Sequence, residues 1–186
     1  MKKEMLTFRL LEKRDLLKRV EIMNNPLVYN TMHYSIPITI ERTLQWFEDN
    51  KNNDTRRDFV LENNGEIVAM NGLTGRDSVI NKVETYSFVD PLQQGKGFGS
   101  IALLLQAGYA FDRWDIQKIW CFSDEDNIAS HTIHRKVGFV KEGELRREVM
   151  KNGCFISRFY FGMLRDDFRR DLYDNLFTSL NISLMS

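Results

Sequence analysis

The sequence predicts a single domain of the α+β class. The chain has 186 residues, a usual length for one domain. Apolar residues make up 42% of it and charged residues 28%, a composition that allows a buried core and excludes a disordered or fibrous protein. Segments with the period of strands alternate with segments with the period of helices, and neither a repeat nor a linker separates them.

The N-terminal third predicts one strand and two helices. Apolar side chains recur at helical spacing after the first strand, and Pro26 ends that run. Thr39 is a typical N-cap for the second helix, and Glu41 lies in its first turn. The expected elements are a strand at 7–10, a helix at 14–23, a loop at 27–38 and a helix from 40 onward.

The remaining two thirds of the chain predict further strands and helices. Two pairs of consecutive strands are expected to be joined by tight hairpin turns. Asn63-Asn64-Gly65 and Lys151-Asn152-Gly153 stand between β-rich segments, as in hairpin turns. Gly138 is placed to end a helix in the left-handed conformation. The expected strands are 59–62, 67–70, 83–89, 118–123, 140–150 and 155–163; the expected helices are 100–114, 127–137 and a terminal one that carries Leu172, Leu176 and Leu180.

Charge and cysteine content exclude several classes of protein. The 26 basic and 26 acidic residues balance, so we expect no nucleic-acid partner. The longest apolar run of interest, 101–105, is far shorter than a membrane span of about 20 residues. Cys121 and Cys154 form no ligand motif with the three histidines, so we expect no metal. Two sparse thiols favour a reducing cytoplasm.

Three glycines between a strand and a helix predict an anion-binding loop. Gly95, Gly97 and Gly99 allow backbone N–H groups to approach a phosphate, and the helix N-terminus adds its partial positive charge. A tight turn without a ligand is the alternative. The run lacks the Ser or Thr of a Walker loop, has Ser100 where the dinucleotide fingerprint has glycine, and also fails the spacing of a kinase loop.

The remaining match is to the GNAT superfamily of N-acetyltransferases. Residues 94–99 (QGKGFG) fit its Gln/Arg-x-x-Gly-x-Gly/Ala loop, and Asn127 with 133–139 (IHRKVGF) resembles its next helix. The segments 142–146, 152–153 and 159–161 are similar to the branch of ribosomal-protein alanine and spermidine acetyltransferases. The resemblance implies a GNAT-like domain over 1–168, with a mixed, mostly antiparallel sheet flanked by helices, and a helical tail over 169–186.

The resemblance also implies a co-substrate and its site. Acetyl-CoA would be held by the loop backbone, with the Ser100 hydroxyl and Lys96 near its phosphates and Asn127 on its pantetheine arm. A backbone N–H near Val89 would polarise the thioester carbonyl. The complete expected set is Phe88, Val89, Gln94, Gly95, Lys96, Gly97, Phe98, Gly99, Ser100 and Asn127.

Two side chains are candidates for proton transfer. Glu84 lies seven residues before Pro91 on the strand that leads to the loop, and as a base it would take a proton from the amine. A solvated rim glutamate is the alternative. His134 stands where many family members have a tyrosine that protonates the thiolate, so it is either an acid or only packed near the pantetheine sulfur. His131 is expected to face solvent and Cys121 to lie in the core.

The acceptor is expected to be a primary amine of a small molecule or of a protein N-terminus. The loop residues His33 and Tyr34 are the candidate substrate contacts. A polyamine would require an acidic groove, for which Glu41, Glu48 and Asp49 are candidates. A non-catalytic acyl-CoA-binding module and a dinucleotide-binding protein are the alternative functions, and the enzyme is expected to be a monomer or a homodimer.

Overall fold

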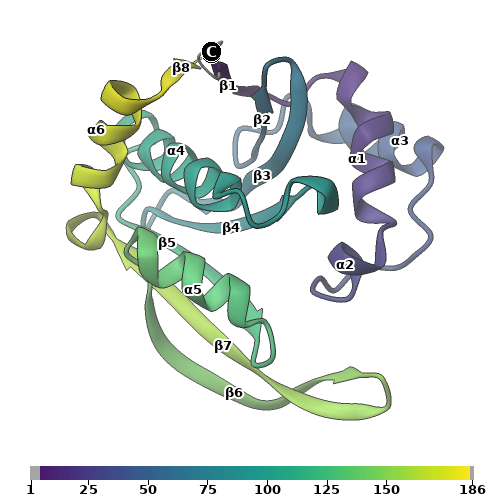
Figure 1. The fold of residues 1–186 in the computed structure, drawn as a ribbon. Helices are drawn as coiled ribbons and strands as arrows, with labels where there is room; N and C mark the ends of the chain where they lie inside the picture. Colours follow the sequence, from purple (N-terminus) through teal and green to yellow (C-terminus); the bar gives the residue numbers. More distant parts are fainter. Residues whose placement is uncertain (1–4, 185–186) are drawn as a thin grey trace.

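An eight-stranded sheet forms the centre of the molecule in the computed structural model, which describes residues 5–184 (Figure 1). The strand order is β6-β7-β5-β4-β3-β2-β1-β8. Strands β1 and β8, and β4 and β5, pair in parallel, and every other neighbouring pair is antiparallel, which confirms the mixed sheet. The strands are β1 (Met5–Leu10), β2 (Arg57–Asn63), β3 (Glu66–Asp77), β4 (Lys82–Val89), β5 (Lys118–Asp124), β6 (Val140–Lys151), β7 (Cys154–Leu164) and β8 (Asn181–Leu184).

Helices cover both faces of this sheet because its inner strands are apolar on both sides. In β2, Phe59 and Leu61 pack in the cluster that contains α4, whereas Val60 packs in the cluster that contains α1 and α3. Alternate residues of a strand point to opposite faces, so one strand supplies two cores. The helices are α1 (Leu16–Met23), α2 (Pro26–Tyr29), α3 (Ile40–Asn50), α4 (Phe98–Arg113), α5 (Ile128–Val137) and α6 (Arg170–Ser179).

The predicted turns have the backbone that their residues favour. Asn64 and Gly65 adopt φ angles of 52° and 85°, and Asn152 and Gly153 adopt 51° and 79°, the left-handed pair of a type I′ hairpin. Gly138 ends α5 at φ 116°, as predicted. A Cβ at Gly138 would collide with the backbone oxygen of Asp167, so this glycine is also required for packing.

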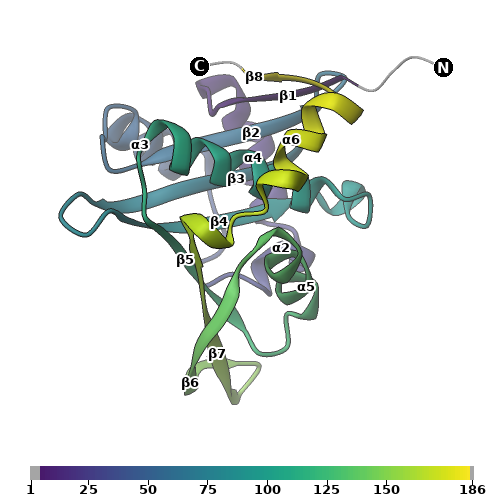
Figure 2. The same cartoon turned by 90° about the vertical axis from the view of Figure 1, so that its left-hand side faces the viewer.

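The structure differs from the predicted elements at several places, among them β3, which continues to Asp77, beyond the expected end at residue 70. The loop expected over 27–38 begins with α2, a short helix that has Asn25 as its N-cap. Helix α4 begins at Phe98, two residues before the expected start, because Gly97 serves as its N-cap. The terminal helix stops at Ser179, and β8 then pairs with β1 from the opposite end of the chain (Figure 2).

The C-terminal segment packs on the body of the molecule. Leu176 is buried in the α4 cluster, with Leu172 and Tyr173 against it. The absence of a side chain at Gly108 of α4 makes room for the ring of Tyr173, which a Cβ there would meet. The division of the chain into a domain over 1–168 and a tail over 169–186 stays a prediction. Helix α6 contacts α4 and β8 extends the central sheet, so the tail packs with the rest of the chain.

Candidate active site

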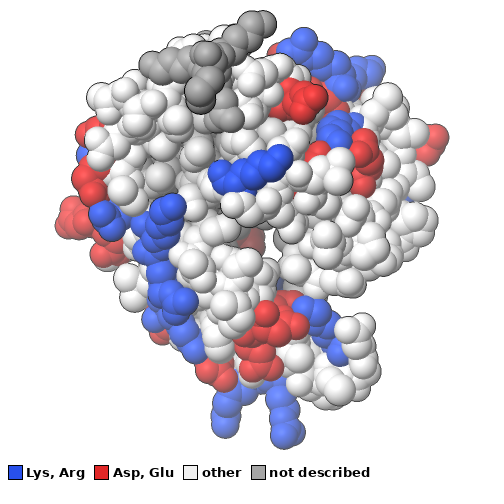
Figure 3. Space-filling model, in the orientation of Figure 1, with Lys and Arg blue, Asp and Glu red and all other residues white. Residues whose placement is uncertain are grey.

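The cavity that holds most of the predicted site residues lies where β4 and β5 separate. These parallel strands pair only from Lys82–Lys118 to Glu84–Trp120, although β4 continues to Val89 and β5 to Asp124. Beyond that point a cleft of about 840 Å³ opens between them. Figure 3 shows the hollow on this face, bordered mostly by uncharged side chains. A space of this volume is sufficient for an extended small ligand.

The glycine loop forms one end of this cavity. Gly95 and Gly97 have φ angles of 79° and 87°, and a Cβ at either position would meet nothing within 4 Å. Gly97 is the N-cap of α4, so the N–H groups of Phe98 and Gly99 have no acceptor within the helix, whereas the Ser100 N–H donates to the Gly97 carbonyl. The loop therefore offers an open concave backbone with a positive dipole end, which fits a phosphate or pyrophosphate.

The loop residues do not all contribute in the same way. Gln94, Phe98 and Ser100 border the cavity together with the three glycines. Gly99 also has a packing role, since a Cβ there would lie 3.0 Å from Cδ1 of Ile133 on α5. The side chain of Lys96 does not border the cavity, and its Nζ donates a hydrogen bond to Oε1 of Gln93 at 2.8 Å.

Strand β4 brings Glu84 into the same cavity. The side chain is half-buried, and burial raises the pKa of Glu84, an effect that the charges of Arg158 and Arg56 partly oppose. Phe88 and Val89 border the cavity farther along the strand, toward the glycine loop. Tyr86 donates its hydroxyl hydrogen to Asp58, and burial raises the pKa of this tyrosine to about 12, so it stays neutral.

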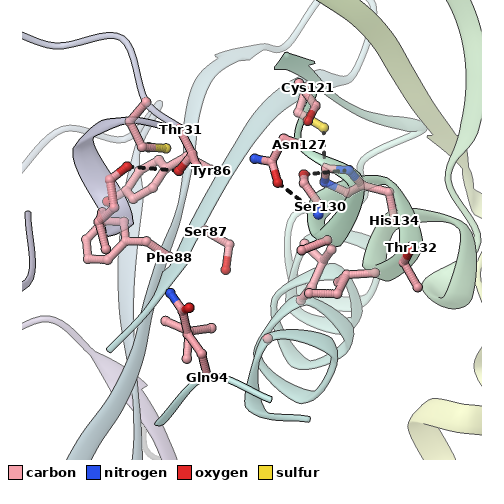
Figure 4. Close-up of a pocket in the computed structure, with 18 of the residues that line it drawn as sticks. Thr31, Tyr86, Ser87, Phe88, Gln94, Cys121, Asn127, Ser130, Thr132 and His134 are labelled. Carbon is pink, nitrogen blue, oxygen red and sulfur yellow. Dashed lines mark hydrogen bonds between the residues drawn. The ribbon is translucent and has the colours of Figure 1, made fainter. Parts of the chain in front are cut away.

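Helix α5 supplies the opposite wall, which Figure 4 shows facing β4. Asn127 is the N-cap of α5, where its Oδ1 accepts a hydrogen bond from the Ser130 N–H at 3.1 Å. The ring of His134 lies between two partners, with Nε2 3.4 Å from Sγ of Cys121 and Nδ1 3.2 Å from Oγ of Ser130. Burial lowers the pKa of His134 to about 4, so the ring is neutral at pH 7.

The expectation that His131 faces solvent was wrong. Its side chain is buried, with Nε2 2.9 Å from the backbone oxygen of Asp124 and its ring against Phe159 and Phe161. The reason is that α5 lies on β7, so the helix face that carries His131 has no access to water. Cys121 is buried as predicted, and burial raises the pKa of its thiol.

On the acceptor side the structure brings one of the two predicted loop residues to the cavity. His33 borders it and places Nε2 2.7 Å from Oδ1 of Asp124, a buried carboxylate at the end of β5. Tyr34 does not border the cavity: its hydroxyl donates to the backbone oxygen of Met23, and its ring packs with α1 and α3. The acidic residues Glu41, Glu48 and Asp49 of α3 do not border it either.

Arg158 is the main residue that the sequence analysis did not identify. It lies opposite Asp124 in the β5–β7 ladder and borders the cavity. The signal was present, because Arg158 is the single charged residue of β7 in an otherwise apolar, aromatic and small-residue strand. Ser87 and Ser130 also border the cavity, but no local pattern distinguishes them from surface serines.

Residues 5–184 contain neither a cluster of metal ligands nor a membrane-spanning helix. No group of three or more side chains in this part of the chain could hold a metal ion. None of its helices is long and apolar enough to cross a membrane.

Known proteins show the same domain. A family model described as an acetyltransferase (GNAT) domain matches residues 5–140. The chain is 26% identical over 165 residues to the prophage-derived uncharacterized N-acetyltransferase YokL of Bacillus subtilis, which covers 89% of this chain and 93% of YokL. It is 30% identical over 109 residues to the spermidine N(1)-acetyltransferase of Escherichia coli K12, a match that spans 59% of each protein.

Solved structures agree on the architecture. The spermidine N-acetyltransferase of Vibrio cholerae in complex with CoA and spermine has a TM-score of 0.82 to this chain at 22% identity, over 87% of this chain and 96% of that one. A chimera of the Vibrio cholerae enzyme has a TM-score of 0.80. At this level of identity the likeness shows the fold alone.

Proposed function

Because the chain belongs to the GNAT family of acetyltransferases, we propose that the cavity between β4 and β5 is where it acetylates a primary amine. The observation that carries the proposal is that the open glycine loop and the half-buried Glu84 border one cavity. The loop suits the phosphates of acetyl-CoA, and the carboxylate suits an ammonium group. One site can therefore hold both reactants.

Acetyl-CoA supplies an acetyl group activated as a thioester. We assign its pyrophosphate to the backbone N–H groups from Gln94 to Gly99, with the Ser100 hydroxyl beside them. Asn127 is assigned to the pantetheine arm, because its side chain borders the cavity on the α5 wall. The Val89 N–H is assigned to the thioester carbonyl, where a fixed donor stabilises developing negative charge.

Glu84 is the base in this proposal. A lysine-like amine has a pKa of about 10, so it arrives protonated at neutral pH and must lose a proton before it can attack. Glu84 borders the cavity, and the pKa of its carboxyl is raised by burial, which makes it a better proton acceptor than an exposed glutamate. It takes the proton directly or through a water molecule.

His134 lines the site in this proposal but does not protonate the thiolate. With a pKa of about 4, the imidazolium is nearly absent at pH 7, so the ring has no spare proton to deliver. We expect His134→Ala to lower kcat by less than about tenfold, below the range of a general acid. Steady-state rates of CoA release measure this, and a 100-fold loss would restore the acid role.

The glycine loop provides a direct test of acetyl-CoA binding. Gly97→Ala is expected to weaken acetyl-CoA binding by at least about tenfold, since a side chain at φ 87° strains the cradle by about 1–2 kcal/mol and obstructs it. Calorimetric titration measures the Kd, with NAD and ATP as control ligands.

Gly153→Ala is the matched control, because Gly153 also has a positive φ, 79°, and open space around it, but lies in the distant β6–β7 turn. Gly153→Ala should lower the free energy of unfolding by a similar amount and leave the Kd for acetyl-CoA unchanged. Equal weakening by both variants would contradict the assignment of the loop.

We place the enzyme in the cytoplasm as a monomer or homodimer. Both thiols are free, with Cys121 buried and Cys154 exposed, which suits a reducing compartment. The Vibrio cholerae relative has been solved as a dodecamer, so light scattering of the purified protein is the measurement that decides the assembly.

A further inference from the structure

The cavity lining has almost no fixed charge. Its residues include one carboxylate, Glu84, and one permanent cation, Arg158. The acceptor-side segment between α1 and α3, residues 24–39, contains no Asp, Glu, Lys or Arg at all. A polyamine carries several positive charges at neutral pH, and each charge removed from water requires a partner. The lining offers one such partner.

Arg158 borders the cavity and has N–H donors without a hydrogen-bond acceptor. Its Nε lies 3.3 Å from Oδ1 of Asp124 without hydrogen-bond geometry, and its guanidinium carbon is 5.0 Å from the centre of the Phe122 ring. Within residues 5–184, neither of its Nη atoms makes a hydrogen bond. A guanidinium has five N–H donors in a planar fork, and its two Nη groups together can bind a carboxylate through two parallel hydrogen bonds.

Asp124 shares its negative charge among several neighbours, so it neutralises Arg158 only in part. The carboxylate also has His33 Nε2 at 2.7 Å and Lys151 Nζ at 3.7 Å. This chain already contains an arginine that serves two carboxylates, since Arg9 bonds both Asp15 and Glu62. Arg158 is therefore able to keep Asp124 as a neighbour and accept a second carboxylate from the cavity.

From this arrangement we propose that the acceptor is a small amine that also carries a carboxylate, with its amine at Glu84 and its carboxylate on Arg158. The inference rests on the proposed function, because Glu84 must receive the amine. Opposite charges at two positions of one cavity match a zwitterion and disfavour a polycation. Arg158 is then a specificity-determining residue that contacts the substrate away from the reacting atoms.

Paired substrates test the proposal. The probes are 4-aminobutanoate, 5-aminopentanoate and 6-aminohexanoate, each compared with its own carboxamide, together with spermidine. We expect the best amino acid to exceed its carboxamide at least about tenfold in kcat/KM, because a hydrogen bond to a charged group is worth that much. Arg158→Gln should lower kcat/KM for the amino acid about 10- to 100-fold and leave the carboxamide unchanged.

Two further variants separate specificity from folding. Arg158→Lys keeps the charge and should restore part of the preference. Lys141→Gln removes a cation of the adjacent strand β6 that lies over the Phe159 ring and outside the cavity, so it should change neither substrate. An unchanged Kd for acetyl-CoA shows that each variant is folded.

The results distinguish the two proposals. Faster turnover of spermidine or of the carboxamides, or a preference that survives in Arg158→Gln, would overturn the zwitterion inference alone. If the chain binds acetyl-CoA but releases no CoA with any amine, both the proposed function and the zwitterion inference are overturned.

Discussion

Replacement of Glu84 by glutamine is expected to lower kcat by at least about 100-fold, within the usual range for loss of a general base. Glutamine has nearly the shape of glutamate but cannot accept the proton of the ammonium group. The Kd for acetyl-CoA should stay unchanged, because the glycine loop lies at the other end of β4. Steady-state CoA release with the best amine and calorimetric titration of acetyl-CoA measure the two effects separately.

The pH profile of the same variant adds a second observable. Glu84 must be ionised to act as a base, so activity rises with pH through its pKa. Burial raises that pKa, so the acidic limb of the kcat profile should lie above the usual value of 4.5 and disappear in Glu84→Gln.

Glu66→Gln, an exposed glutamate at the start of β3, is the control that should leave the profile intact. A Glu84→Gln enzyme with near wild-type kcat would mean that another group takes the proton. A wild-type chain that binds acetyl-CoA without turnover of any amine would favour the non-catalytic module.

Replacement of Asp15 by asparagine is expected to lower the free energy of unfolding by about 3–5 kcal/mol, the usual cost of breaking a buried ion pair. Both side chains are buried, and Nη1 and Nη2 of Arg9 lie 2.7 and 2.8 Å from the two oxygens of Asp15. Asparagine carries no charge, so the Arg9 guanidinium keeps Glu62 as its anionic partner and loses the buried one. Urea denaturation at pH 7 measures the change.

The Arg9–Asp15 pair lies next to an element that contacts the segment leading to the glycine loop. Asp15 directly precedes α1, and Lys18 of that helix lies 2.7 Å from Asp90, just before the glycine loop. Asp171→Asn is the control, since its pair with Arg169 is on the surface, and the denaturation midpoint should not move measurably. A loss near zero in Asp15→Asn would show that water replaces the missing interaction.

Local signals account for much of the agreement between sequence and structure. The two Asn-Gly turns and the Gly138 cap were predictable because only residues that tolerate a positive φ fit them. Helix α4 was predictable apart from its first turn, where Gly97 rather than Ser or Thr begins the helix. The short helix α2 was missed because one turn of helix leaves too weak a periodic pattern to detect.

Contacts between distant parts of the chain account for the differences. His33 meets Asp124 across 91 positions of sequence, and Asp124 faces Arg158 only through the register of β5 and β7. A shift of one residue in that register would turn Arg158 to the other face of the sheet. The lone charge of β7 marks Arg158 as unusual, but no local pattern shows that it reaches the cavity. For the same reason Tyr34 was expected at a cavity that it does not reach.

By itself the sequence determined the domain class, the tight turns and the glycine loop before α4, because each depends on the backbone freedom and periodicity of neighbouring residues. Only the tertiary structure decided that β8 completes the sheet, that His131 is buried and that Glu84 and Arg158 share one cavity. These features depend on strand register and on the separation of β4 from β5, which are set by packing over the whole chain.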